Sequence, residues 1–206
     1  SPDPKDSLSI GATFVRQTLS DKNGNLWIAT NKGLYRFDYR THIFKGFFHS
    51  ETDSLSLVTD GIYTLFEDRD SVLWLGTIGH GLERHNRNDN TFTHYRHNSD
   101  DSTSLSSDAV NAICQDLLGN LWIGTSNGLN KFDRKTGNCI RFFHEADNDN
   151  SISHNTITNL LLDHKGMIWI VTWSNVQIFD PYNNLLIRDP IMPWRYLFCP
   201  QYPDIS

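Results

Sequence analysis

The sequence predicts an all-β fold built from four copies of one unit, and three observations support this prediction. Tryptophans recur 47, 48 and 47 residues apart, at Trp27, Trp74, Trp122 and Trp169. Each lies in the same short phrase, which begins with an Asp and ends with a Thr, as in Asp116 to Thr125. The segments around each phrase are strand-like and lack helical periodicity, so the chain is an array of one β-unit.

Each unit contains four short strand-like segments, which are clearest in the third unit at residues 109–114, 121–125, 128–132 and 139–143. Four short strands joined by turns within about 40 to 50 residues have the dimensions of a propeller blade. We therefore expect a β-propeller with four blades of four antiparallel strands. The expected blades cover residues 1–50, 51–98, 99–145 and 146–188, followed by a tail outside the repeat at residues 189–206.

The turn between the first and second strands carries an Asp and, three residues later, usually a Gly. The Asp side chain can accept hydrogen bonds from nearby backbone N–H groups, and Gly supplies the positive φ that a tight turn needs. We expect structural roles for these turn residues, which are Asp21, Gly24, Asp68, Asp116, Gly119, Asp163 and Gly166. The second unit has Ser71 in place of the Gly.

The second strand carries the tryptophan, and both of its faces are apolar or small, as expected for a sheet that is covered on both sides. We expect all four tryptophans to be structural core, packed between neighbouring blades. Small residues occupy the second position after each tryptophan, namely Ala29, Gly76, Gly124 and Val171. These small residues are predicted to leave room for a facing aromatic side chain.

A Ser-rich loop leads into each unit, and its copies align as residues 6–9, 53–56, 103–106 and 150–153. Four units permit either a closed four-bladed ring or an arc of a larger, seven-bladed ring. The arc is favoured because the first unit has no earlier strand that could close a ring. The repeat fails after Asp180.

Composition excludes several partners and cofactors. The net charge of −6 and the pI near 5.8 argue against nucleic acid, because phosphate binding needs clustered Lys and Arg. No apolar run approaches the roughly 18 to 20 residues of a membrane helix, so we expect no membrane contact from this segment. The cysteines, Cys114, Cys139 and Cys199, have neither metal-site spacing nor an even number, and we expect no metal and no cofactor.

Candidate binding residues come from propeller geometry, which places the loops between blades and the turns between second and third strands on one face. On the short turns of this face the candidates are Asn31, Lys32, His80, Asn127, Trp173 and Asn175. Trp173 has two interpretations: its indole could stack on a sugar ring, or it could cover the edge of a terminal blade.

Two patterns resemble metal sites but favour other roles. His49, His97 and His144 recur at the end of the outer strand, where adjacent blades are too far apart to share one ion, so we expect loop-anchoring hydrogen bonds instead. The run that starts at Asp147 resembles an EF-hand loop, but it lacks the required Gly and has Thr158 where the Glu should be.

The repeated phrase Asp-x-x-Gly-x-Leu-Trp-Ile-Gly-Thr-x-x-Gly-Leu resembles the regulator-propeller repeats of bacterial two-component sensors, especially the hybrid systems of gut Bacteroidetes. The similarity extends from about Asp6 to Asp180. It implies a periplasmic sensor, anchored in the inner membrane and paired as a homodimer, that recognises oligosaccharides from glycan breakdown. It also implies a membrane helix and a histidine kinase, neither of which is present in this chain.

Two other functions compete with ligand sensing. The chain has no nucleophile elbow, zinc-protease, phosphate-loop or dinucleotide motif, so we expect no enzyme activity from it. A propeller-type glycoside hydrolase or lyase remains an alternative, because carboxylates from different blades can converge without a sequence motif. A protein-interaction scaffold is a further alternative.

Overall fold

A computed structural model describes residues 10–12 and 14–187 of the 206-residue chain. The described residues form sixteen strands in four separate antiparallel sheets, and each sheet consists of four strands that are consecutive in the chain. The expected tail at residues 189–206 and the first copy of the Ser-rich loop at residues 6–9 lie outside the described residues.

The four sheets have closely similar strand lengths. The first sheet consists of β1 (Val15–Ser20), β2 (Asn25–Thr30), β3 (Gly33–Asp38) and β4 (Ile43–Phe47). The second consists of β5 (Ile62–Glu67), β6 (Leu73–Thr77), β7 (Leu82–Asn86) and β8 (Thr91–Tyr95). The third consists of β9 (Val110–Gln115), β10 (Leu121–Thr125), β11 (Gly128–Phe132) and β12 (Cys139–Phe142). The fourth consists of β13 (Ile157–Leu162), β14 (Ile168–Thr172), β15 (Val176–Asp180) and β16 (Leu185–Ile187).

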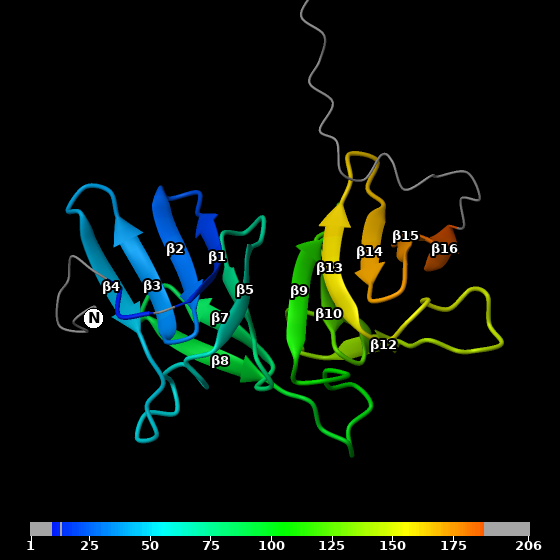
Figure 1. Cartoon of the computed structure of the whole chain (residues 1–206), viewed down its shortest axis with the longest axis horizontal. Helices are drawn as coiled ribbons and strands as arrows, with labels where there is room; N and C mark the ends of the chain where they lie inside the picture. Colours follow the sequence, from blue (N-terminus) through cyan, green and yellow to red (C-terminus); the bar gives the residue numbers. More distant parts are fainter. Residues whose placement is uncertain (1–9, 13, 188–206) are drawn as a thin grey trace, which may run out of the picture.

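The sheets follow one another as the blades of an open arc (Figure 1). The first strand of each sheet is the innermost one: β1 contacts β5, β5 contacts β9, and β9 contacts β13. Within the described part of the chain, no contact of similar extent joins β13 to β1. The predicted four-bladed, all-β propeller arc is therefore confirmed.

The arc has two faces, which we name by their connections. The turn face holds the turns between first and second strands and between third and fourth strands of each sheet. The loop face holds the turns between second and third strands together with the loops that link one sheet to the next. Backbone hydrogen bonds join these two parts of the loop face, from Gly33 to Asp60, from Gly81 to Asp108 and from Gly128 to Asn155.

The tryptophans of the first three sheets are fully buried, and each packs on the third strand of the following sheet. The ring centroids lie 5.1 Å apart for Trp27 and His85, 5.5 Å for Trp74 and Phe132, and 5.0 Å for Trp122 and Phe179. Trp169 is only half-buried, which differs from the expected core role, because the described residues contain no fifth sheet to cover it.

The small residues after the tryptophans make room for a different side chain from the one predicted. A Cβ added to Gly76 would lie 2.7 Å from a methyl carbon of Val110, and one added to Gly124 would lie 2.6 Å from a methyl carbon of Ile157. Val110 and Ile157 are β-branched residues of the next inner strand. The expectation of a facing aromatic side chain was therefore wrong, because the aromatic ring packs further out along the blade and the inner strand occupies this space.

The Asp of each repeated turn binds the tryptophan of its own unit, a contact that the sequence analysis did not predict. The indole N–H donates to the Asp carboxylate in all four sheets, at 2.8 Å for Asp21, 2.9 Å for Asp68 and Asp116, and 3.0 Å for Asp163. Burial alone would raise the pKa of Asp21, but hydrogen bonds from Trp27, Asn25 and Arg87 outweigh it and lower that pKa to about 2. The carboxylate thus remains charged and fixes the indole in place.

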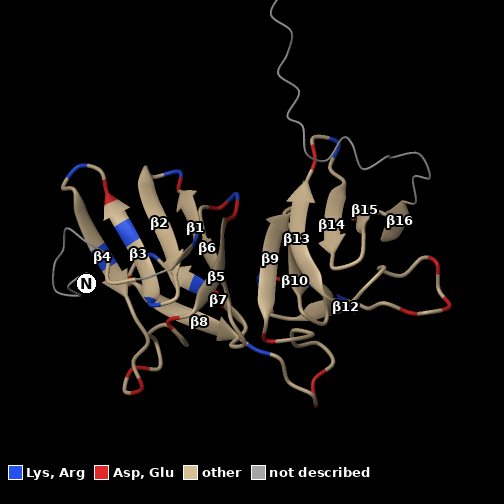
Figure 2. Cartoon of the chain, in the orientation of Figure 1, with Lys and Arg blue, Asp and Glu red and all other residues tan. Residues whose placement is uncertain are grey.

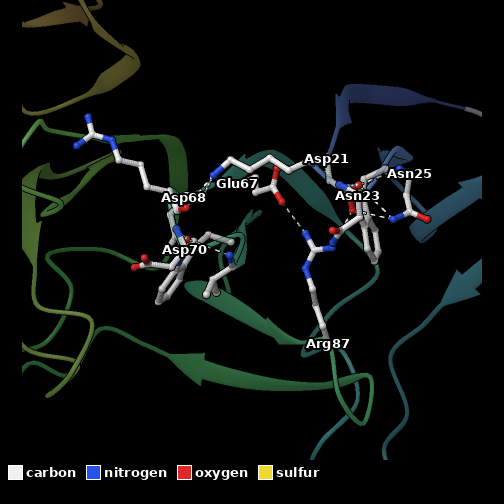
Figure 3. A network of polar contacts seen from close by, with 12 residues as sticks. Asp21, Asn23, Asn25, Glu67, Asp68, Asp70 and Arg87 are labelled. Atoms are coloured by element: carbon white, nitrogen blue, oxygen red, sulfur yellow. Dashed lines mark hydrogen bonds and ion pairs between the residues drawn. The ribbon is translucent and has the colours of Figure 1, made fainter.

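Arginines on the turn face tie two pairs of adjacent sheets together, and Figure 3 shows the tie that Arg87 makes. Arg87 of the second sheet donates to Asp21 of the first sheet at 2.8 Å and to Glu67 of its own sheet at 2.9 Å. Arg134 of the third sheet donates in the same way to Asp68 of the second sheet at 2.8 Å. Pro181 stands at the equivalent position of the fourth sheet, so its junction lacks this arginine.

Replacing Arg134 with Ala is expected to lower the free energy of unfolding by about 1 to 2 kcal/mol, because Asp68 is buried and loses a charged donor. Urea unfolding followed by tryptophan fluorescence measures this change. Lys135→Ala, at the neighbouring exposed position, is the matched control. Equal losses in the two variants would contradict a specific tie between sheets.

Histidines at the ends of the outer strands anchor the linking loops. The ring Nδ1 atoms of His49, His97 and His144 lie 2.7, 2.7 and 2.8 Å from the carbonyl oxygens of Leu57, Leu105 and Ile152. This agrees with the loop-anchoring role expected for these histidines.

Hydrogen bonds in the same loops show that one predicted alignment of the Ser-rich loops was wrong. Ser56 accepts a hydrogen bond from the backbone of Ser50 just as Ser104 does from Asn98, so residues 56–58 correspond to residues 104–106. The alignment of residues 53–56 with residues 103–106 was therefore wrong by two positions.

Candidate functional site

The six predicted binding residues all lie in exposed turns of the loop face. Asn31 and Lys32 follow β2, His80 follows β6, Asn127 follows β10, and Trp173 and Asn175 follow β14. They are distributed over all four sheets, so the structure places them along one face of the arc and not in a single pocket.

A threonine hydroxyl holds each of these turns in shape. The side chains of Thr30, Thr77 and Thr125 donate to the carbonyl oxygens of Gly33, Gly81 and Gly128 at 2.7, 2.7 and 2.9 Å. In the fourth sheet, Thr172 donates to the carbonyl oxygen of Asn175 at 3.0 Å. The threonine that ends each repeated phrase is thus a buried scaffold for the exposed turn residues.

Trp173 is the most exposed large apolar residue in the described part of the chain, at 80%. The backbone N–H groups of Ser174 and Asn175 bind the Thr172 hydroxyl, which fixes the turn that carries the indole. An indole so exposed covers little of the sheet edge, which favours the ligand-stacking interpretation of Trp173.

A second exposed aromatic group lies where β1 and β5 meet the loop face. The Arg16 guanidinium carbon lies 4.5 Å from the ring centroid of Phe14 and 5.6 Å from that of Tyr63. Phe14 is 53% exposed and Tyr63 is 38% exposed. Asn31 adjoins this group, because its side-chain oxygen accepts the Phe14 backbone N–H at 3.2 Å. The sequence analysis missed these residues, since they contact one another only after two units have packed.

Charge is unevenly distributed over the loop face (Figure 2). The long linking loops are acidic and carry Glu51, Asp53, Asp100, Asp101, Glu145, Asp147 and Asp149. The basic residues named above, Arg16 and Lys32, belong to the first sheet. A ligand on this face therefore meets different charge near the inner strands and at the outer loops.

The inner strands line a hollow of about 540 Å³ on the side of the turn face. Its volume falls in the range of small-molecule sites. The amide groups that line it are already used: Gln17 exchanges two hydrogen bonds with the backbone of Leu65, and Gln115 bonds the backbone of Arg69 and Gly119. None of the six predicted binding residues lines the hollow.

Two observations on the described residues concern metal binding and acid–base chemistry. They contain no cluster of three or more His, Cys, Asp or Glu side chains arranged to hold a metal ion. Burial raises the pKa of Glu83 to about 8 although the backbone N–H of Val58 and the charge of Arg96 oppose the shift. Glu83 is fully buried between strands and therefore has no access to a substrate in this structure.

Three segments of the chain match the family model described as two component regulator propeller, at residues 9–32, 56–79 and 104–127. These segments contain the inner strand and the tryptophan phrase of the first three sheets, and the second and third segments also contain the end of the preceding linking loop. No curated protein matches the chain. The described residues include no helix with the length and apolarity needed to cross a membrane.

Solved structures with the same fold include extracellular domains of bacterial one component and hybrid two component systems. The extracellular domain of BT4673 from B. thetaiotaomicron, described as a one component system, superposes with a TM-score of 0.67 at 21% identity over 85% of this chain and 22% of its own. That of BT3049 from the same organism, described as a hybrid two component system, gives 0.62 at 22% identity over 86% and 30%. The chain thus spans less than a third of either sensor domain.

An enzyme also shares the fold. Virginiamycin B lyase from Staphylococcus aureus superposes with a TM-score of 0.64 at 14% identity, over 87% of this chain and 57% of the lyase. At these identities the superpositions establish the propeller fold, whereas the matched segments identify the repeat. The first three sheets therefore carry two component regulator propeller repeats.

Proposed function

We propose that this chain is the ligand-sensing part of a two-component sensor and that it recognises glycan-derived oligosaccharides outside the cytoplasm. The repeat type and the fold shared with extracellular sensor domains support a sensing role. In this proposal the complete sensor is a periplasmic homodimer that signals through a membrane helix to a kinase, and those parts belong to the longer protein.

The observation that carries the oligosaccharide proposal is the pair of exposed aromatic groups on the loop face. Trp173 near one end of the arc is 80% exposed, and Phe14 and Tyr63 near the other end are 53% and 38% exposed. Polar side chains stand beside them, including Asn31, Lys32 and Asn175. Ring faces flanked by hydrogen-bonding groups suit a sugar, which has both apolar C–H patches and hydroxyl groups.

Isothermal titration of the chain against a panel of neutral and acidic oligosaccharides tests this function. We expect at least one member to bind and Trp173→Ala to weaken that binding by roughly tenfold, as expected for the loss of a stacked ring. Tyr182→Ala removes an exposed aromatic residue from the turn face and is the matched control, expected to bind normally. Binding by no member of the panel would refute oligosaccharide sensing.

A lyase or hydrolase is the alternative function, favoured by the fold shared with virginiamycin B lyase. Incubating the chain with the same panel distinguishes the two. Cleaved products would establish an enzyme, whereas binding with intact sugars supports the sensor.

A further inference from the structure

The junction of the first two sheets holds a guanidinium group that has no ionic partner among the residues the structure describes. Arg16 contacts the rings of Phe14 and Tyr63, and no carboxylate among the described residues lies within ion-pair distance of it. Among the other arginines that contact a neighbouring sheet, Arg87 and Arg134 are paired with carboxylates, whereas Arg69 donates to the Leu117 carbonyl at 2.8 Å.

Arg16 is not needed to hold these two sheets together. The next residue, Gln17, already bridges them, because its side chain donates to the Leu65 carbonyl at 3.1 Å and accepts the Leu65 backbone N–H at 2.7 Å. The equivalent residue of the third sheet, Asn111, uses its amide to donate to the Ile157 carbonyl of the fourth sheet at 2.8 Å. Arg16 therefore differs from Asn111 in leaving its polar groups available.

Stacking on the aromatic rings leaves the N–H groups of the Arg16 guanidinium available to bind an anion. Aromatic rings hold an arginine by its flat faces, so the N–H groups around its edge remain free to donate. Two parallel N–H groups match the two oxygens of a carboxylate, and such bidentate pairs are both strong and specific. Lys32 adds a second exposed cation on the turn that Asn31 joins to Phe14.

Asp60 of the linking loop holds the backbone on this face: its carbonyl oxygen accepts the Gly33 backbone N–H, and its carboxylate accepts the His49 backbone N–H at 2.7 Å. The chain carries a net charge of −6, so an anion binds here only through local contacts and not through the overall field.

We propose that Arg16, Phe14, Tyr63 and Lys32 form a subsite for a hexuronate residue of the oligosaccharide ligand. The sugar carboxylate binds the edge of the Arg16 guanidinium, and the sugar ring lies against the exposed surface of Phe14 or Tyr63. This subsite rests on the proposed oligosaccharide-sensing function and specifies its substrate class as acidic glycans.

The test compares hexuronate oligosaccharides with their methyl esters, which keep the sugar ring and linkage but lose the charge. Oligomers of galacturonate and of glucuronate are titrated into the chain by calorimetry, each beside its ester. We expect a free acid to bind roughly tenfold or more tightly than its ester, because a charge-assisted pair is lost. We expect Arg16→Gln to remove this difference and to leave binding of the ester unchanged.

Arg40→Gln, at an exposed position of the turn face, is the matched control and should preserve the preference for the acid. Unchanged thermal unfolding of Arg16→Gln shows that the variant is folded. Equal affinity for acid and ester, or an acid preference that survives Arg16→Gln, would overturn the subsite. Binding of neutral sugars alone would overturn the subsite and retain the sensing function, whereas binding of no sugar would refute both.

Discussion

Replacing Trp122 with Ala is expected to lower the free energy of unfolding by about 3 to 5 kcal/mol, the usual cost of removing a large buried aromatic side chain. Trp122 is fully buried and contacts both Phe142 of its own sheet and Phe179 of the next sheet. The substitution also leaves the buried Asp116 carboxylate without the indole N–H that binds it at 2.9 Å.

Urea unfolding measures this loss, and Trp169→Ala provides the comparison. Trp169 makes the same bond to its own Asp163 but is only half-buried, so its replacement should cost clearly less. If Trp122→Ala lowered the stability by less than about 1 kcal/mol, packing between sheets could not be the main role of this residue.

Replacing Glu83 with Gln is expected to change how stability depends on pH. Burial raises the pKa of Glu83 from its usual value of 4.5 to about 8 in the folded chain. The folded state therefore retains a proton that the unfolded state releases as the pH rises through 4.5. The wild-type chain loses stability between about pH 4.5 and pH 8, and the shift corresponds to a loss on the order of 5 kcal/mol.

The repeats supply the reason to choose Gln. Glu83 accepts the Val58 backbone N–H at 2.7 Å, just as Gln177 accepts that of Ser153 at 2.6 Å and Asn130 accepts that of Ser106 at 2.9 Å. An amide therefore keeps the bond to the loop and does not ionise. His94 lies 3.8 Å from the same carboxylate, so the difference between the two chains reports on the Glu83 carboxyl group together with this contact.

Urea unfolding of both chains at a series of pH values tests this expectation. The stability difference between Glu83→Gln and wild type should grow from pH 5 to pH 8 and then level off. Glu145→Gln, in an exposed loop, is the control and should show no such growth. Parallel curves for Glu83→Gln and wild type would show that Glu83 does not hold its proton in the fold.

The sequence predicted the architecture because the tryptophans recur at a regular spacing along the chain. Four phrases at nearly constant spacing require four similar units, and the strand-like segments of each unit specify a blade. The alignment of the linking loops was less secure, since Ser and Leu alternate from Ser54 to Leu57 and two alignments fit equally well. Only the hydrogen bonds of Ser50 and Ser56 distinguish them.

Contacts between units were beyond sequence reasoning. Arg87 and Asp21 lie 66 residues apart, and nothing in the sequence near either residue marks the pair. The same holds for Arg16 and Tyr63, which meet only because β1 and β5 lie side by side at the axis. The exposed turn residues could be named from the order of strands alone, whereas the aromatic and guanidinium group required the packed structure.

The two arginine–carboxylate ties run in the same direction, from a sheet back to the sheet before it. Every such tie joins matching positions of neighbouring units, so a unit copied or deleted between equivalent residues leaves the surviving junctions chemically unchanged. Duplication of a genetic segment of one repeat length can therefore lengthen the array without requiring a new kind of interface. Each new copy also adds one loop-face turn whose sequence is free to diverge.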